Sequence, residues 1–480
     1  MDISRTDFHQ ALERVVQLAL NRNDTLSDLP VVKVNHDFVQ AESQLLNTPL
    51  PEKGQALNDI FSSVYDTVLK DAPNANGPRY FGLITGGTTP ASIVGDFLAT
   101  LYDLNVSLHL PKETIATAVE QLALDMVLDL CYIPREAYPG KILTTGATAS
   151  NAVGLMVGRQ WVAQKKWNID IAEDGFCGKT IKLIGGSVHS SVIKAAAMVG
   201  IGRRNCIDVS LDDEGHQWDL EQLEKILSEQ QLKDNEASIV VVGYGEINTG
   251  CFAADVLKIR ELCTKYDAWL HIDAAFGMYA RAIPSHAHMA RHIEVADSMT
   301  SDGHKWLNVP YDCGLFYTKH VDVCEQVFGA KSAYLATADA GGADIRQPLN
   351  MSIENSRRFR ALPLYMSLLT YGAEGYRDMF ASNCRFTELL GDWINEHAGL
   401  ELLKPVQLHN VLFRATADKW NTAGGNDAFI DAIKETGLLY VSKTVWKGKP
   451  AIRAAVSNWR TSIDTDLPIT TKAIEIALQS

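Results

Sequence analysis

The chain is predicted to be an α/β protein, with a mostly parallel central sheet in a large domain and a small C-terminal α+β domain. Short apolar runs typical of strands alternate with segments of helical character, and polar residues follow several of these runs. Small strands near residues 411–413 and 451–456 indicate the C-terminal domain. In an open α/β sheet, ligands bind beyond the carboxyl ends of the strands, so the functional site is expected there.

The length of the chain predicts more than one compact domain. With 480 residues it exceeds what one hydrophobic core normally serves. We expect an N-terminal helical segment over residues 1–75, a large domain over 76–360 and a small domain over 361–480. A stretch dense in turn formers, residues 71–78, marks the first boundary. The helical segment is expected to cover either its own domain or a partner subunit.

Composition narrows the class of protein. The chain has 46% hydrophobic residues, 21% charged residues and a formal net charge of −14 without a basic run, which argues against nucleic acid or an anionic membrane as partner. The 8 cysteines show neither a C-x-x-C pair nor metal-ligand spacing, so we expect no metal and reduced thiols. No signal peptide and no run of roughly 20 apolar residues is present, which predicts a cytoplasmic protein.

One lysine stands between a histidine and a tryptophan in the segment 297–306, between two β-favouring runs. A lysine amine becomes a useful nucleophile at neutral pH when desolvation or a neighbouring cation lowers its pKa, and it then bonds to carbonyl carbons. Lys305, flanked by His304 and Trp306, is placed where this chemistry is expected. The alternative is an ordinary surface lysine, since lysine is seldom fully buried without a partner.

A carboxylate ends a predicted strand upstream of this lysine. The apolar runs 239–243 and 268–273 are predicted strands, and the second ends at Asp273. Because the carboxyl ends of such strands line the ligand site, Asp273 is expected to point into it. An aspartate against a pyridine nitrogen and a lysine bonded to an aldehyde are the two protein groups that pyridoxal phosphate (PLP) needs.

A phosphate cradle and a stacking side chain complete the pattern. The tight polar turn at 146–151 follows a predicted strand and opens a segment of helical character, so its N–H groups are expected to face an anion. The predicted phosphate-binding residues are Thr148, Ala149, Ser150 and Asn151. His189 follows the predicted strand 181–184 and is expected to lie over the cofactor ring. The alternatives are an ordinary capped helix start and a histidine that is only hydrogen-bonded.

With these motifs in this order, the sequence resembles the group II PLP-dependent amino-acid decarboxylases, which include the glutamate and aromatic-amino-acid enzymes. The resemblance runs from about residue 78 to about residue 362 and is densest at 189–191, 271–275 and 304–306. It implies a fold type I (aspartate-aminotransferase-like) PLP enzyme that forms a homodimer with shared active sites.

The resemblance also implies roles for individual residues. Tyr334 aligns with the tyrosine that reprotonates the substrate carbon after CO2 has left, and Thr85 falls at a substrate-contacting position. Arg453 is a candidate for gripping a substrate carboxylate, with a structural ion pair as the alternative. The predicted catalytic residues are Lys305, His189 and Tyr334. The predicted cofactor-binding residues are Thr148, Ala149, Ser150, Asn151, His189, Asp273, Ala275, Asp302, His304 and Lys305. The predicted substrate-binding residues are Thr85 and Arg453.

Several positions depart from the family pattern. Glu246 and Ile247 stand where family members commonly carry two threonines, and Asp302-Gly303 stands where many have Asn-Pro. Ala147 replaces a glycine that the glutamate enzymes usually show. These changes indicate a divergent branch, so the identity of the substrate does not transfer.

The expected reaction is removal of the α-carboxylate of an L-amino acid, giving an amine and CO2. Decarboxylation is favoured because Tyr334 and His189 are both present, whereas aldehyde-forming relatives typically replace one of them. The alternatives are another PLP enzyme (a lyase, an aldehyde-forming enzyme or an aminotransferase), a Rossmann-type dehydrogenase and a non-catalytic binding protein. The dehydrogenase is weakened because the turn at Gly146 lacks a G-x-G-x-x-G pattern.

Overall fold

The computed structural model describes residues 5–33, 38–212, 217–253, 255–329 and 345–480. The chain divides into two units. The first, which we call the sheet unit, comprises residues 86–387 and 406–410, and the second, the terminal unit, comprises residues 1–85, 388–405 and 411–480. This grouping differs from the three predicted segments, because the N-terminal helices join the end of the chain and residues 361–387 join the sheet unit. Helix α12 (Ala361–Glu396) is kinked at Gly372, where the backbone is not helical, and its second part runs past residue 387.

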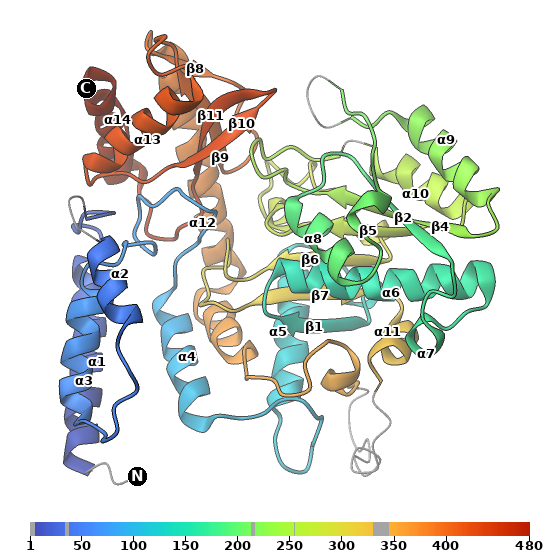
Figure 1. Ribbon diagram of the computed structural model, residues 1–480, viewed down its shortest axis with the longest axis horizontal. Coiled ribbons are helices and arrows are strands. Elements are labelled where there is room, and N and C mark those ends of the chain that lie inside the picture. Colours follow the sequence, from blue (N-terminus) through green and yellow to red (C-terminus); the bar gives the residue numbers. More distant parts are fainter. Residues whose placement is uncertain (1–4, 34–37, 213–216, 254, 330–344) are drawn as a thin grey trace. The chain divides into compact units, whose positions relative to one another are not determined.

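A seven-stranded sheet forms the centre of the sheet unit (Figure 1), in the order β1-β7-β6-β5-β4-β2-β3. Its strands are β1 (Gly140–Thr144), β2 (Thr180–Gly185), β3 (Cys206–Asp208), β4 (Glu236–Gly243), β5 (Trp269–Asp273), β6 (Ser298–Asp302) and β7 (Gly314–Thr318). Strand β7 is antiparallel to both β1 and β6, whereas the pairs from β6 through to β3 are parallel. Strands β4 and β5 are apolar and buried along most of their length, which suits a sheet covered on both faces.

Strand register brings the predicted site residues to one edge of the sheet. In the parallel pair of β5 and β6, Asp273 is opposite Thr300, so the chain of β6 continues beyond Asp273 to Asp302. Strand β4 ends beside β5, with Gly243 opposite Asp273. The carboxyl ends of β4, β5 and β6 therefore lie together.

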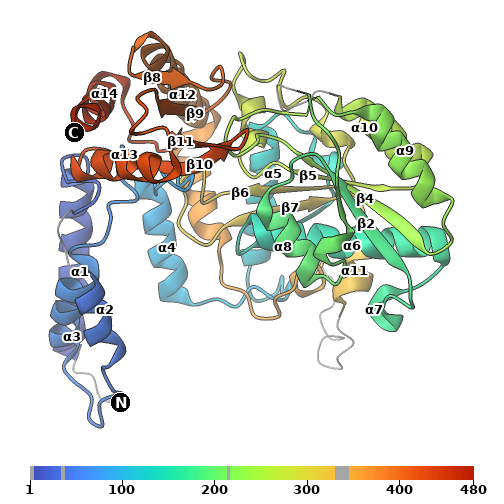
Figure 2. The ribbon, with the colours of Figure 1, turned by 45° about the horizontal axis from the view of Figure 1, so that its top comes forward.

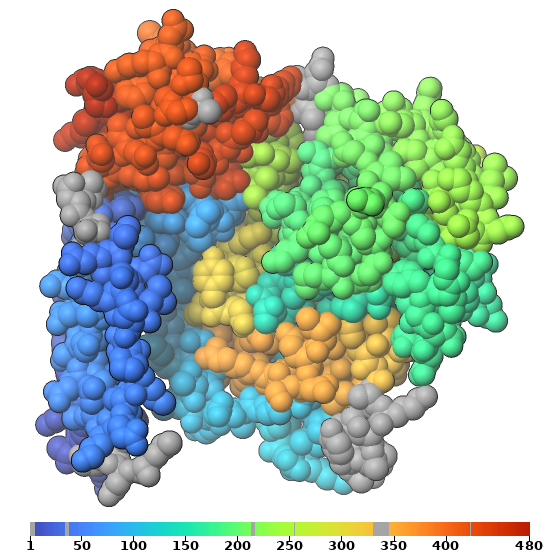
Figure 3. All heavy atoms as spheres, viewed as in Figure 1, coloured from blue at the N-terminus to red at the C-terminus, as the bar shows by residue number. Residues whose placement is uncertain are grey.

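Helices cover both faces of this sheet. Figure 2 shows α6 and α8 on one side and α5, α9 and α10 on the other, and in the space-filling view of Figure 3 the helices and loops of the near side cover the strands. The helices of the sheet unit are α4 (Pro90–Tyr102), α5 (Ala116–Leu130), α6 (Ala147–Trp167), α7 (Ile171–Asp174), α8 (Ser190–Met198), α9 (Leu220–Gln231), α10 (Val256–Lys265) and α11 (Val321–Phe328).

Helix α6 approaches the strands closely because it carries two glycines one turn apart. A Cβ on Gly154 would lie 2.7 Å from His271 Cε1, and one on Gly158 would lie 2.8 Å from Trp269 Cδ1. Any larger residue would push the helix away from β5. The apolar side chains of α6 join those of the strands in one buried core.

The terminal unit combines helices with a small sheet of order β10-β11-β9-β8. Its helices are α1 (Arg5–Thr25), α2 (Phe38–Leu46), α3 (Leu57–Val64), α13 (Ala423–Glu435) and α14 (Ile463–Gln479), with a π-helical turn at Tyr65–Leu69. Its strands are β8 (Leu400–Leu402), β9 (Asn410–Ala415), β10 (Ser442–Trp446) and β11 (Lys449–Ala455). In the described parts of the chain, no helix is both long and apolar enough to cross a bilayer.

Candidate active site

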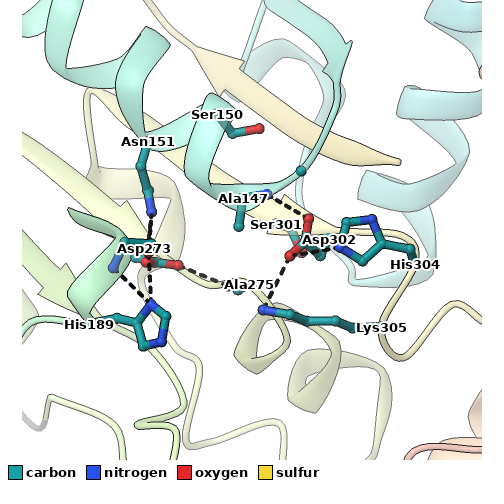
Figure 4. Close-up of polar contacts among 12 residues, drawn as sticks. Ala147, Ser150, Asn151, His189, Asp273, Ala275, Ser301, Asp302, His304 and Lys305 are labelled. Atoms are coloured by element: carbon teal, nitrogen blue, oxygen red, sulfur yellow. Dashed lines mark hydrogen bonds and ion pairs between the residues drawn. The ribbon is translucent and has the colours of Figure 1, made fainter. Parts of the chain in front are cut away.

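Lys305 lies in the loop that follows β6, half-buried at the carboxyl edge of the sheet. Its Nζ is 3.1 Å from Asp302 Oδ2 and 6.0 Å from the centroid of the Phe276 ring. Figure 4 shows the lysine side chain pointing toward Asp302. The lysine backbone is fixed by close contact with Gly86, since a Cβ at residue 86 would lie 1.6 Å from the Lys305 carbonyl oxygen. The amine is thus held over the strand ends rather than directed into solvent.

Trp306 anchors the turn that carries this lysine. The indole is fully buried, and its N–H donates to Asn383 Oδ1 at 2.9 Å. The ring stacks on His409, with centroids 4.4 Å apart. A buried indole needs a hydrogen-bond partner, which explains why a tryptophan fits here only together with Asn383.

Asp273, at the end of β5, is held as a hydrogen-bond acceptor. Its Oδ2 accepts from Asn151 Nδ2 at 2.9 Å, and its Oδ1 accepts from the backbone N–H of Ala275 at 3.2 Å. Figure 4 shows the Asn151 side chain directed toward this carboxylate. Each oxygen of this carboxylate therefore has one N–H donor.

A relay of buried hydrogen bonds fixes the orientation of the Asn151 amide. Ser298 Oγ accepts from Trp269 Nε1 at 3.1 Å and lies 2.7 Å from His271 Nδ1. His271 Nε2 lies 2.9 Å from Asn151 Oδ1, an atom that can only accept. His271 therefore donates from Nε2, and Asn151 must turn its NH2 group toward Asp273. Sequence reasoning did not find this role of His271, although the residue lies in the motif that ends at Asp273.

Burial lowers the pKa of His271 from 6.5 to about 4, with Asp273 opposing the shift. The folded protein therefore binds this proton less readily than the unfolded chain, so its stabilising effect is present above about pH 6.5 and is lost as the pH falls toward about 4. We expect a loss of about 2 kcal/mol of stability between about pH 7 and about pH 5 from this residue alone.

The measurement is the thermal midpoint of unfolding of the native protein and of His271→Gln at several pH values. The native midpoint should fall more steeply on acidification than that of the variant, and the exposed control His288→Gln should follow the native protein. Parallel curves for the native protein and His271→Gln would show that His271 is not the responsible group.

The predicted phosphate turn forms the start of helix α6. Gly146 precedes it with φ +156°, a backbone conformation that favours glycine. The first N–H of the helix, that of Ala147, donates to Asp302 Oδ1 at 2.7 Å. The N–H groups of Thr148 and Ala149 belong to the same first turn, where a helix provides no acceptor of its own. An anion is the natural acceptor for such groups.

Ser150 has a different place from the one that the sequence suggests for a phosphate-binding hydroxyl. Its side chain is fully buried, and its Oγ lies 2.8 Å from Thr144 Oγ1 at the end of β1. Its backbone N–H donates to the Gly146 carbonyl at 3.0 Å. The hydroxyl therefore joins the turn to the strand before it.

His189 caps the N-terminus of α8. Its Nδ1 accepts from the Ser191 N–H and lies 2.7 Å from Ser191 Oγ, while the side chain stays exposed. The ring is thus oriented by the hydrogen bonds of one nitrogen.

His304 and Ala275 both contact Asp302. His304 Nδ1 accepts from the Cys313 N–H at 3.1 Å, and its Nε2 lies 3.5 Å from Asp302 Oδ2. Burial lowers the pKa of His304, partly opposed by Asp302. The Ala275 carbonyl accepts from the Asp302 N–H at 3.0 Å, which links the loop after β5 to the end of β6.

Three further predicted site residues lie outside the described part of the sheet unit. Tyr334 and the loop around it lie outside the described residues. Thr85 and Arg453 belong to the terminal unit, where the Thr85 carbonyl accepts from Ser457 Oγ at 3.3 Å and Arg453 is opposite Ser442 in the β10–β11 hairpin. Their roles stay predictions.

Three kinds of groups therefore meet at one edge of the sheet unit: an amine on Lys305, an acceptor carboxylate on Asp273, and N–H groups at the start of α6. This donor set fits PLP, which needs a lysine, an acid at its ring nitrogen and a phosphate site. In the described residues, no group of three or more histidine, cysteine or acidic side chains could hold a metal ion.

Comparisons with known proteins agree with this chemistry. The model of the pyridoxal-dependent decarboxylase conserved domain matches residues 40–416. L-2,4-diaminobutyrate decarboxylase of Acinetobacter baumannii is 30% identical over 304 residues, which are 61% of this chain and 58% of that protein. Aromatic-L-amino-acid decarboxylase of Bacillus atrophaeus is 25% identical over 492 aligned residues, 99% of this chain and 97% of that protein.

A solved structure shows the same fold. Oryza sativa TDC with PLP and tryptamine aligns with a TM-score of 0.87 at 20% identity, covering 100% of this chain and 99% of that chain. The predicted α/β fold of type I PLP enzymes is therefore confirmed, and so are the predicted family and its cofactor. Because the family model spans most of the sequence, including the whole edge described above, the chain belongs to the pyridoxal-dependent decarboxylase family.

Proposed function

We propose that the protein removes the α-carboxylate of an L-amino acid, releasing CO2 and an amine. The observation that carries this proposal is the meeting of Lys305 and Asp273 at neighbouring strand ends, beside the first turn of α6. When bound, PLP supplies an electron sink for the bond that breaks at the substrate carbon.

The residues at this edge divide the work of holding the cofactor. Lys305 would hold it covalently, and the N–H groups at Thr148 and Ala149 would bind its phosphate, in the turn completed by Ser150 and Asn151. The exposed ring of His189 would cover one face of the pyridine. Asp273, positioned by its two donors, would keep the ring nitrogen protonated. Ala275, Asp302 and His304 would shape the wall between these groups.

The remaining proposed roles rest on sequence. Tyr334 would return a proton from its phenol to the substrate carbon after CO2 has left. Thr85 and Arg453 would contact the substrate, with the guanidinium of Arg453 as a carboxylate partner. By resemblance to the family, the active unit would be a homodimer with shared sites.

The substrate is best found by a product screen. The purified protein with PLP should release CO2 and the matching amine in equal amounts from one class of L-amino acid, with acidic, aromatic and diamino acids as the first three classes to test. Aldehyde in place of amine would identify an aldehyde-forming enzyme, and keto acid without CO2 an aminotransferase. Release of none of these products from any amino acid would contradict the proposal.

A further inference from the structure

A buried carboxylate occupies the start of the phosphate turn. Asp302 is only 2% exposed, and its Oδ1 accepts the Ala147 N–H at 2.7 Å, the first donor of helix α6. Its Oδ2 lies 3.1 Å from Lys305 Nζ (Figure 4). One side chain thus touches the group that would hold the cofactor and a donor of the turn that would bind its phosphate.

Among the described residues, Lys305 is the cation that pairs with this carboxylate. His304 Nε2 also faces Asp302 at 3.5 Å, but His304 Nδ1 accepts from the Cys313 N–H. A ring nitrogen that accepts a hydrogen bond carries no proton, so His304 is neutral with its proton on Nε2. Burial also lowers the pKa of His304, which disfavours the imidazolium.

Three further titratable groups near Asp302 in the described structure, Tyr279, Tyr311 and Cys313, are neutral as well. Burial raises the pKa of Tyr311 and of Cys313, and the nearby Asp302 carboxylate raises both further. The hydroxyl of Tyr279, which donates to the Asp302 carbonyl at 3.0 Å, likewise has a pKa raised by burial. A ligand that takes Lys305 away from Asp302 leaves a buried carboxylate next to a phosphate.

Two anions at the same helix start repel each other, strongly where one of them is buried, so their simultaneous ionisation is disfavoured. Building on the function proposed above, we propose that Asp302 regulates cofactor loading: its carboxylate stands in for the phosphate at Ala147 and restrains Lys305 in the cofactor-free protein, and a phosphorylated pyridine binds together with a proton. An asparagine at this position would keep the acceptor for Ala147 and remove the negative charge.

The test measures binding rather than turnover, with pyridoxine 5′-phosphate as probe because its alcohol cannot bond to Lys305. Calorimetric titration of the cofactor-free protein near neutral pH should give a Kd that is about tenfold or more lower for Asp302→Asn than for the native protein. Titration in two buffers of different ionisation enthalpy should show that the native protein takes up about one proton more than the variant.

Two controls isolate the charge at residue 302. Asp297 directly precedes β6, is also buried and pairs with Arg260 at 2.7 Å, so Asp297→Asn removes the same charge at the opposite end of that strand without touching the phosphate turn. Its Kd for the probe should equal the native value. Unphosphorylated pyridoxine should bind native protein and Asp302→Asn with the same affinity.

The outcomes separate this inference from the proposed function. If native protein binds the probe and Asp302→Asn binds it equally or more weakly, with the same proton uptake, the regulatory role of Asp302 is wrong and the proposed function stands. If neither binds the probe or PLP, the proposed function fails. Asp302→Ser, a small neutral acceptor, replaces Asp302→Asn if the asparagine variant does not fold, and the same change in Kd is expected.

Discussion

Lys305→Ala is expected to reduce the rate of CO2 release about a thousandfold or more, equivalent to about 4 kcal/mol or more on the barrier. The reason is that alanine removes the amine that the structure holds over the strand ends, 3.1 Å from Asp302 and beneath the fixed backbone at Gly86. The measurement combines turnover with borohydride reduction and mass spectrometry. A pyridoxyl group should appear on the peptide that contains residue 305 in the native protein and be absent from the variant.

Two further variants make this result specific. Lys305→Arg keeps the positive charge beside Asp302 but cannot lose a proton at accessible pH, so it should be as inactive as the alanine variant. Lys258→Ala removes an exposed lysine of α10 and should leave turnover unchanged. A pyridoxyl adduct on another peptide, or native turnover by Lys305→Ala, would overturn the assignment.

Asp273→Asn is expected to lower turnover about a hundredfold to a thousandfold, or about 3 to 4 kcal/mol on the barrier. Asparagine has nearly the same size but no charge, so the ring nitrogen of the cofactor would lose the acid that keeps it protonated. Only one of the two acceptor oxygens would remain for the N–H groups of Asn151 and Ala275, which lie 2.9 and 3.2 Å from the native carboxylate. The measurement is kcat with saturating PLP, together with the absorption spectrum of the bound cofactor.

Asp219→Asn is the matched control for net charge. Asp219 is the N-cap of α9, where its side chain accepts from the Gln222 N–H, and asparagine caps helices equally well. This variant should retain native kcat. If Asp273→Asn matched it in kcat and in spectrum, Asp273 would have no part in tuning the cofactor.

The sequence predicted those site residues that directly follow a strand, because an apolar run shows where a strand ends. The predicted strand 314–318 is β7, and the predicted strands 239–243 and 268–273 correspond to β4 and β5. Because neighbouring parallel strands end at one edge, the residues after them could be placed together without coordinates. The positions of Asp273 and Lys305 follow from this rule.

What the sequence did not reveal depends on contacts between distant segments. The insertion of β7, antiparallel, between β1 and β6 leaves no local signal, because its apolar run fits either direction. The relay from His271 to Asn151 joins residues 120 positions apart, so neither side chain discloses it alone. The same holds for the Asp302 contact with Ala147, where only the departure from the family pattern indicated that the position was unusual.

Helix α6 would set the distance between the phosphate site and the ring-nitrogen site of the cofactor. Its first turn carries the proposed phosphate donors, and Asn151, about one turn of roughly 5.4 Å further along, orients the acid for the ring nitrogen. Gly154 and Gly158 let α6 pack closely against β5, so both sites belong to one firmly packed helix. The distance from the phosphate site to the ring-nitrogen site is therefore expected to be fixed. Analogues with a longer phosphate arm should bind weakly whatever their charge.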